Sequence, residues 1–270
     1  MTPLTVTFDT NALWSVTSPD RAQRATATEG AIIRKAVQEG RILGFFSETV
    51  LTLEGIQKKD RADVLGQTRV LTSSESTGKN SINLTIGVRH RRKPLDPEFS
   101  RRVRAAYELG LLPLRAPARM ALSPHLDAAQ YPLYEPPGGI HELVRCMEKV
   151  NHLAKEITAR EVGQAPAVAF GVQLTRSAGV TEPELWLQGL GRASTRSERK
   201  KVSRVVAEWA DGDSVAAHYG FGIDLFCSDD FAKSRTGRSI LDGDNRRWLS
   251  ECFGIRFVTL AELARQVTAS

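Results

Sequence analysis

The sequence predicts an α/β fold, with a central, mainly parallel sheet covered by helices and a mostly helical insertion in the middle of the chain. Residues 4–8 (LTVTF) alternate apolar side chains with threonine, which is the two-residue period of a strand. A helical pattern over 22–39 and a second apolar run over 41–46 follow, and this strand–helix–strand order is typical of parallel sheets. The same alternation of helices and strands returns at the C-terminal end of the chain.

The C-terminal elements divide the chain into a core and an insertion. We expect helices over 199–210 and 211–222, a strand over 223–230, a helix over 245–254, a strand over 255–259 and a closing helix over 260–267. The middle of the chain contains Pro- and Gly-rich breaks, with helices near 98–110, 139–162 and 182–189. The sequence therefore predicts a core formed by 1–57 and 191–270, interrupted by an insertion over 58–190.

The composition is typical of a globular protein that has a substantial core. The chain has 270 residues, of which 41% are hydrophobic and 25% are charged. No apolar stretch is long enough for a membrane span, and the N-terminus lacks the pattern of a signal peptide. Three widely spaced cysteines offer no CxxC-type zinc site and fit a reducing compartment. We expect a cytoplasmic protein with no membrane partner.

Positive charge is concentrated in two segments. The net charge is +6, and residues 89–104 contain seven Arg or Lys against two acids, while residues 192–204 contain six against one. Such segments fit a polyanion such as nucleic acid, although a solvated helix face gives the same pattern.

Four acidic residues occupy equivalent places in the predicted fold. Asp9 ends the first strand, and Glu54 lies in a short helix expected over 47–57, with Ser47 as its N-cap. Asp213 opens the helix over 211–222, and Asp229 ends the next strand. Because the carboxyl ends of parallel strands share one edge of a sheet, these four carboxylates are expected to converge there. Their mutual repulsion would be relieved by a divalent cation, and oxygen ligands favour Mg²⁺ or Mn²⁺.

Each of these assignments has an alternative. Asp9 or Asn11 could simply cap the following helix, since both side-chain types accept hydrogen bonds from free backbone amides. Asp211 competes with Asp213, Asp230 with Asp229, and Glu48 with Glu54, because each lies close by in the sequence.

Three sequence segments resemble motifs of the PIN-domain nucleases. They are TFDTNALW (7–14), SETVLTLEG (47–55) and DSVAAHYGFGIDLFCSDDF (213–231). The resemblance implies a three-layer αβα PIN-like fold in which Asp9, Glu54, Asp213 and Asp229 are catalytic. The chain departs from the family at Cys227, where a hydroxyl is usual, and the insertion makes it longer than compact VapC-type toxins.

The resemblance implies a Mg²⁺- or Mn²⁺-dependent endoribonuclease. Asp9, Asp213 and Asp229 would hold the metal, while Glu54 would orient or deprotonate the attacking water or hold a second ion. Asn11 and Ser228 would support the cluster. RNA is the expected partner, together with an antitoxin or another protein if the chain is a toxin, and a homodimer is compatible with the family.

Two other functions remain open from the sequence. The first is a PIN-like module that binds RNA or a protein without catalysis. The second is a phosphatase of the haloacid dehalogenase type, whose first strand also ends in Asp. That family requires a second Asp two residues later, where this chain has Asn11.

Overall fold

The computed structural model describes residues 2–18, 26–78, 81–89, 96–117, 131–180, 186–231 and 239–269, with backbone alone for 69–89. Its centre is a five-stranded sheet in the order β5-β2-β1-β6-β7. The strands are β1 (Leu4–Phe8), β2 (Ile42–Ser47), β5 (Leu112–Leu114), β6 (Leu225–Cys227) and β7 (Phe257–Val258). All four pairings are parallel, which confirms the predicted α/β fold.

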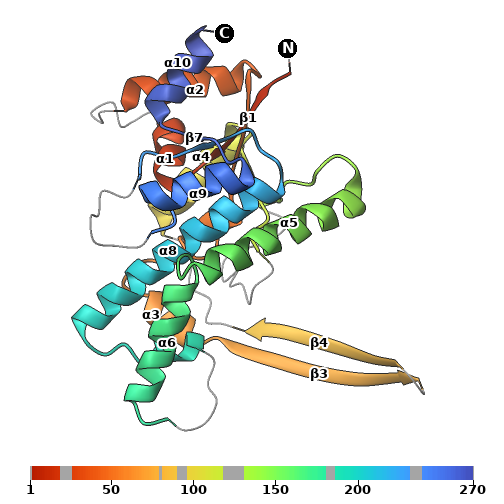
Figure 1. The fold of residues 1–270 in the computed structure, drawn as a ribbon, viewed down its shortest axis with the longest axis vertical. Helices are drawn as coiled ribbons and strands as arrows, with labels where there is room; N and C mark the ends of the chain where they lie inside the picture. The colour runs from red at the N-terminus through yellow and green to blue at the C-terminus, as the bar shows by residue number, and fades with distance from the viewer. Residues whose placement is uncertain are drawn as a thin grey trace.

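Helices cover both faces of this sheet and give it three layers (Figure 1). One apolar core joins the sheet to the helices α1 (Thr10–Thr17), α2 (Ala27–Gln38), α4 (Pro97–Glu108) and α10 (Leu260–Ala269). The core on the other face joins it to α5 (Gly139–Ala159), α8 (Arg196–Gly220) and α9 (Gly243–Phe253). β1 is buried on both sides: Val6 and Phe8 belong to the first core, and the buried Thr7 contacts His218 of α8.

The 25-residue helix α8 connects the sheet to a second apolar core. Its first half packs with α3 (Arg61–Gly66), α6 (Ala165–Ser177) and α7 (Trp186–Leu190) around the buried Trp209. The predicted break between helices 199–210 and 211–222 is wrong. Gly212 continues the helix, and a side chain there would lie 2.8 Å from the backbone of Gly163, so the glycine is used for close packing. Asp213 is consequently inside a helix and does not cap one.

The central segment differs from the predicted helical insertion in two ways. Strand β5 lies inside 58–190 but pairs with β2 and forms one edge of the central sheet. Strands β3 (Arg69–Gly78) and β4 (Ser81–Arg89) form an antiparallel ribbon that extends away from the helices (Figure 1). The sheet is thus completed by a strand of the segment that we expected to be separate from it.

The region after β2 is also less helical than expected. The predicted helix over 47–57 is reduced to the 3-10 turn η1 (Glu48–Val50), although Ser47 does cap it by accepting from the amide of Thr49.

Within the described ranges, no helix has both the length and the apolar character required to cross a lipid bilayer.

Candidate acidic site

Asp9 lies at the carboxyl end of β1, at the centre of the sheet. It has left the strand and acts as the N-cap of α1, where its Oδ1 accepts from the amide of Thr10 at 2.8 Å. The side chain is only 5% exposed. The capping role and the site role, which the sequence left as alternatives, are therefore compatible in one residue.

A hydrogen-bond network joins Asp9 to the end of the neighbouring strand β6. Ser228 donates to Asp9 Oδ2 at 2.7 Å, and the Asn11 amide donates to the same oxygen at 3.0 Å. The backbone amide of Asp229 donates to Asn11 Oδ1 at 3.0 Å. Phe8 and Cys227 are register partners, so this network fixes the two strand ends beside each other. The structure thus places Asn11 and Ser228 directly around Asp9.

Glu54 reaches the same region from the segment after β2. The Thr10 hydroxyl donates to Glu54 Oε1 at 2.7 Å, so Thr10 links Glu54 to the start of α1. Burial, followed by the negative charge of Asp9, raises the pKa of Glu54 to about 7. Its ionised form is therefore disfavoured near neutral pH, as expected for a carboxyl group placed beside another.

Asp211 and Asp230 belong to the same group of charges. The pKa of Asp211 is raised well above its usual range by burial and then by the charges of Asp9 and Glu54, with Glu208 and Asp230 contributing less. Burial is also the main cause of the raised pKa of Asp9, and Asp230 adds to it. The amide of Asp230 donates to Ser228 Oγ at 3.1 Å, which ties this residue to the network around Asp9.

Asp213 and Asp229, the residues favoured from the sequence, make other contacts. Asp213 is 4% exposed, and its Oδ2 accepts from the indole of Trp209 at 2.8 Å. Asp229 Oδ1 accepts from the amide of Leu260 at 3.0 Å, at the start of α10. Asp213 therefore bonds within α8, and Asp229 bonds the start of α10, while Asp9 interacts electrostatically with Asp211 and Asp230.

Two further residues near the site, Glu48 and His218, are engaged elsewhere. Glu48, the competitor of Glu54, accepts from the amide of Ala116 and so holds the chain that leaves β5. His218 lies under the sheet, with its Nδ1 at 3.0 Å from the Thr7 hydroxyl, and burial lowers its pKa to about 3. A neutral, buried imidazole fits a packing role better than a catalytic one.

Arg61 is a charged neighbour of the cluster that the sequence pattern did not indicate. It is 4% exposed, and it interacts electrostatically with Glu54 and Asp211. In the sequence it is one of several basic residues near the start of the insertion, and nothing in its spacing indicates burial. Only the packing of α3 against α8 reveals it.

The donor chemistry of the group fits a hard divalent cation. Asp9, Glu54, Asp211 and Asp230 offer only oxygen atoms, and burial with repulsion from neighbouring carboxylates disfavours the ionised forms of Asp9, Glu54 and Asp211. A bound cation would offset the repulsion between these carboxylates and favour their ionised forms. Among the described residues, no three acidic, His or Cys side chains lie close enough together to hold a metal ion as they stand. The four carboxylates therefore interact electrostatically but do not form a complete set of metal ligands.

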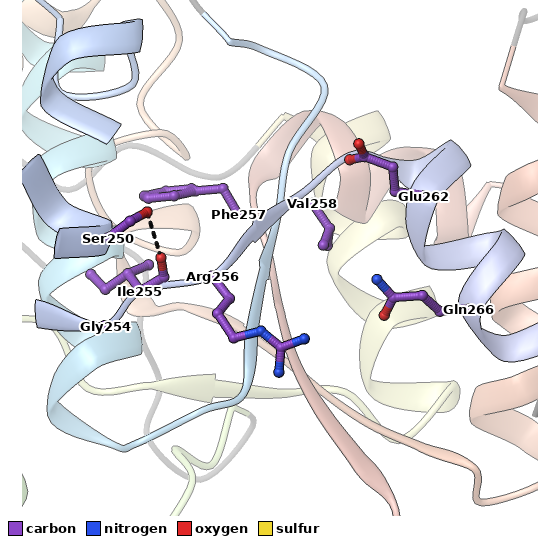
Figure 2. Close-up of a pocket in the computed structure, with 8 residues that line it drawn as sticks. All are labelled: Ser250, Gly254, Ile255, Arg256, Phe257, Val258, Glu262 and Gln266. Carbon is purple, nitrogen blue, oxygen red and sulfur yellow. Dashed lines mark hydrogen bonds between the residues drawn. The ribbon is translucent and has the colours of Figure 1, made fainter. Parts of the chain in front are cut away.

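A pocket with a volume of about 500 Å³ lies elsewhere, along the edge strand β7 (Figure 2). It is bounded by the end of α9 and by α10, and Figure 2 shows Arg256, Glu262 and Gln266 around it. Ser250 donates to the carbonyl of Ile255 at 2.8 Å on one wall. The described residues that line this pocket do not include the four acids, so the pocket is distinct from the acidic site.

Comparisons with known protein families, with curated proteins and with solved structures find no match to this chain.

Proposed function

We propose that the protein is a metal-dependent ribonuclease whose acidic site consists of Asp9, Glu54, Asp211 and Asp230. The observation that carries this proposal is the electrostatic interaction of Glu54, Asp211 and Asp230 with Asp9, which lies at the carboxyl end of β1. A folded protein gains nothing in stability from packing four acids together. Such an arrangement is instead typical of a site that binds a cation and an anionic substrate.

The residues around the cluster fit the roles that phosphodiester hydrolysis requires. Asp9, Asp211 and Asp230 would hold Mg²⁺ or Mn²⁺, which when bound supplies an acidified water and covers charge on the phosphate. Glu54, with a pKa of about 7, is suited to accept a proton from the attacking water near neutral pH. Ser228 and Asn11 hold Asp9 in one orientation by donating to its Oδ2.

A basic stripe on α8 supports RNA as the substrate. Arg196, Lys200 and Arg204 are exposed and recur every four residues, so they lie along one side of the helix. Asp211, seven residues beyond Arg204, falls on the same side. Phosphates bound along this stripe would lead an RNA strand toward the acidic site. In a protein of this composition we place the activity in the cytoplasm.

The test is cleavage of a labelled RNA pool by the purified chain with Mn²⁺, Mg²⁺ or EDTA. We expect cleavage with either metal and none in EDTA. Asp211→Asn and Asp230→Asn should each reduce the rate by at least about two orders of magnitude, as loss of a group that stabilises developing charge does. Asp213→Asn and Asp229→Asn are the matched controls, and they should retain most of the activity.

Two outcomes would contradict parts of this proposal. If the control pair loses activity while the first pair retains it, the site is the one first predicted from the sequence, with Asp213 and Asp229 as ligands. If the wild-type chain binds RNA and never cleaves it with any divalent metal, the protein is a non-catalytic RNA-binding module.

A further inference from the structure

The two edge strands of the central sheet differ in whether their outer side is covered. Edge strand β5 has Pro113 at the position that faces away from β2, and proline offers no N–H group there. The carbonyl of Pro113 accepts from the amide of Tyr134 at 2.8 Å, and the Tyr134 ring packs against Phe45 of β2. A neighbouring segment of the chain therefore closes this edge, which is one of the ways in which proteins protect edge strands.

Edge strand β7 keeps its outer backbone groups open. The carbonyls of Arg256 and Val258 accept from the amides of Phe226 and Ser228 at 2.9 and 3.0 Å, so they face β6. Phe257 lies between them, and its N–H and C=O therefore point away from β6. Among the described residues, neither group has a hydrogen-bond partner. The pocket along β7 lies on this outer side, between the end of α9 and α10 (Figure 2).

The side chains along β7 give the two sides of the pocket different chemistry. Phe257 packs against Phe226 in the core that includes α9. Val258 belongs to the core that includes α10, and Arg256 lies on the same face of the strand because side chains alternate. A strand laid beside β7 would continue both faces. Its residue next to Phe257 would meet the end of α9, and the flanking residues would meet Arg256 and α10.

Arg256 is the open charge of this pocket. It is exposed, and within the described ranges its side chain makes no hydrogen bond or ion pair. It acts electrostatically on Asp224, but that carboxylate already accepts from the amide and the hydroxyl of Thr5. Glu262, the acid that lines the pocket, accepts in the same way from both groups of Thr259. A free guanidinium beside an open strand edge favours a carboxylate on the incoming chain.

We propose that β7 is a docking site for an extended, acidic segment of a partner protein, which adds to the central sheet beside Phe257 and pairs a carboxylate with Arg256. Recognition at a sheet edge takes affinity from main-chain hydrogen bonds and specificity from alternate side chains. Because β7 has only two residues, the side-chain contacts decide which segment binds. The pocket is separate from the acidic site, so this inference does not depend on the proposed nuclease activity.

The probe is the acetylated and amidated peptide Thr-Glu-Val-Glu-Val-Glu-Thr, which places glutamate on one face of a strand and valine on the other. Binding to the isotope-labelled full chain is followed by two-dimensional NMR. We expect the amide signal of Phe257 to shift, and its hydrogen exchange to slow, at about 1 mM peptide. The same peptide with lysine in place of glutamate should not bind.

A charge reversal tests the role of Arg256. Arg256→Glu should weaken peptide binding at least about tenfold, because it replaces an attraction with a repulsion. Arg247→Glu is the matched control. Arg247 is exposed on α9 and is not among the residues that line the pocket, so its reversal should change binding by less than about twofold.

Two N-methylated peptides test the main-chain pairing on the wild-type chain, whatever the stability of the variants. One carries the methyl groups on its valine nitrogens, and the other carries them on its glutamate nitrogens. Only one of these two sets can face β7, because backbone groups alternate between the sides of a strand. One peptide should therefore bind at least about fivefold more weakly than the unmodified peptide, and the other should bind about equally well.

Four results would overturn the inference. They are a Phe257 amide signal that does not respond to the peptide, equal binding of the lysine peptide, unchanged binding by Arg256→Glu, and equal binding of both N-methylated peptides. A shift of the Phe257 signal with protein concentration in the absence of peptide would also overturn it, because the edge would then pair with a second copy of the chain.

Discussion

The raised pKa of Glu54 predicts that replacing this residue with glutamine stabilises the protein at alkaline pH. In the folded chain this pKa is about 7, against an ordinary value of 4.5. Between these values the folded state binds more protons than the unfolded state, so the unfolding free energy falls as pH rises from 4.5 to 7 and then levels off. Glutamine has the same shape, can still accept from the Thr10 hydroxyl, and carries no charge.

The size of the effect follows from the shift in pKa. A difference of about 2.5 units corresponds to roughly 3.4 kcal/mol at 1.36 kcal/mol per unit. Because Glu54 is partly exposed and solvent screens part of this repulsion, we expect a gain of about 2 to 3 kcal/mol at pH 8. At pH 4 both states carry a mostly neutral Glu54, and the gain should nearly vanish.

Urea unfolding followed by circular dichroism, at pH 4, 6 and 8 in EDTA, measures this gain directly. Glu262→Gln is the matched control, since Glu262 accepts from the amide and hydroxyl of Thr259 and its pKa is lowered. That control should lose stability at pH 8. If Glu54→Gln changes stability equally at all three pH values, or lowers it at pH 8, the placement of Glu54 among the acids is incorrect.

Three further predictions test other parts of the structure. His218 has a pKa of about 3 when folded and about 6.5 when unfolded, so wild type should lose about 2 kcal/mol relative to His218→Asn when the pH falls from 7 to 5, as measured by urea unfolding. Gly66→Ala should cost about 1 to 3 kcal/mol because the added carbon would lie 2.3 Å from another backbone atom, whereas Gly243→Ala, with open space around it, should be nearly neutral in the same thermal melts. Ser228→Ala removes a donor to Asp9 and should cost about 1 to 3 kcal/mol of unfolding free energy, and an unchanged denaturation midpoint would contradict this.

Local patterns were sufficient to predict most of the core elements. The alternation in residues 4–8 predicted β1, and the capping role of Ser47 was visible in its position after an apolar run. These features depend on neighbours in the sequence, which is why they can be read from it. The break that we predicted at Gly212 failed because a distant segment, at Gly163, packs against that glycine.

Some features of the candidate site could likewise be predicted from the sequence, and others depend on the tertiary structure. The sequence by itself located Asp9 at the end of a central strand and drew attention to every acid that now surrounds it. It could not indicate how α8 is rotated against the sheet, a rotation in which Asp211 interacts electrostatically with Asp9 and Asp213 accepts from the indole of Trp209. Nor could it indicate Arg61, whose burial depends on the packing of α3 against α8. Residue type and spacing decide what a side chain can do, while the partners and the solvent exposure that fix its charge are decided by contacts between segments far apart in the chain.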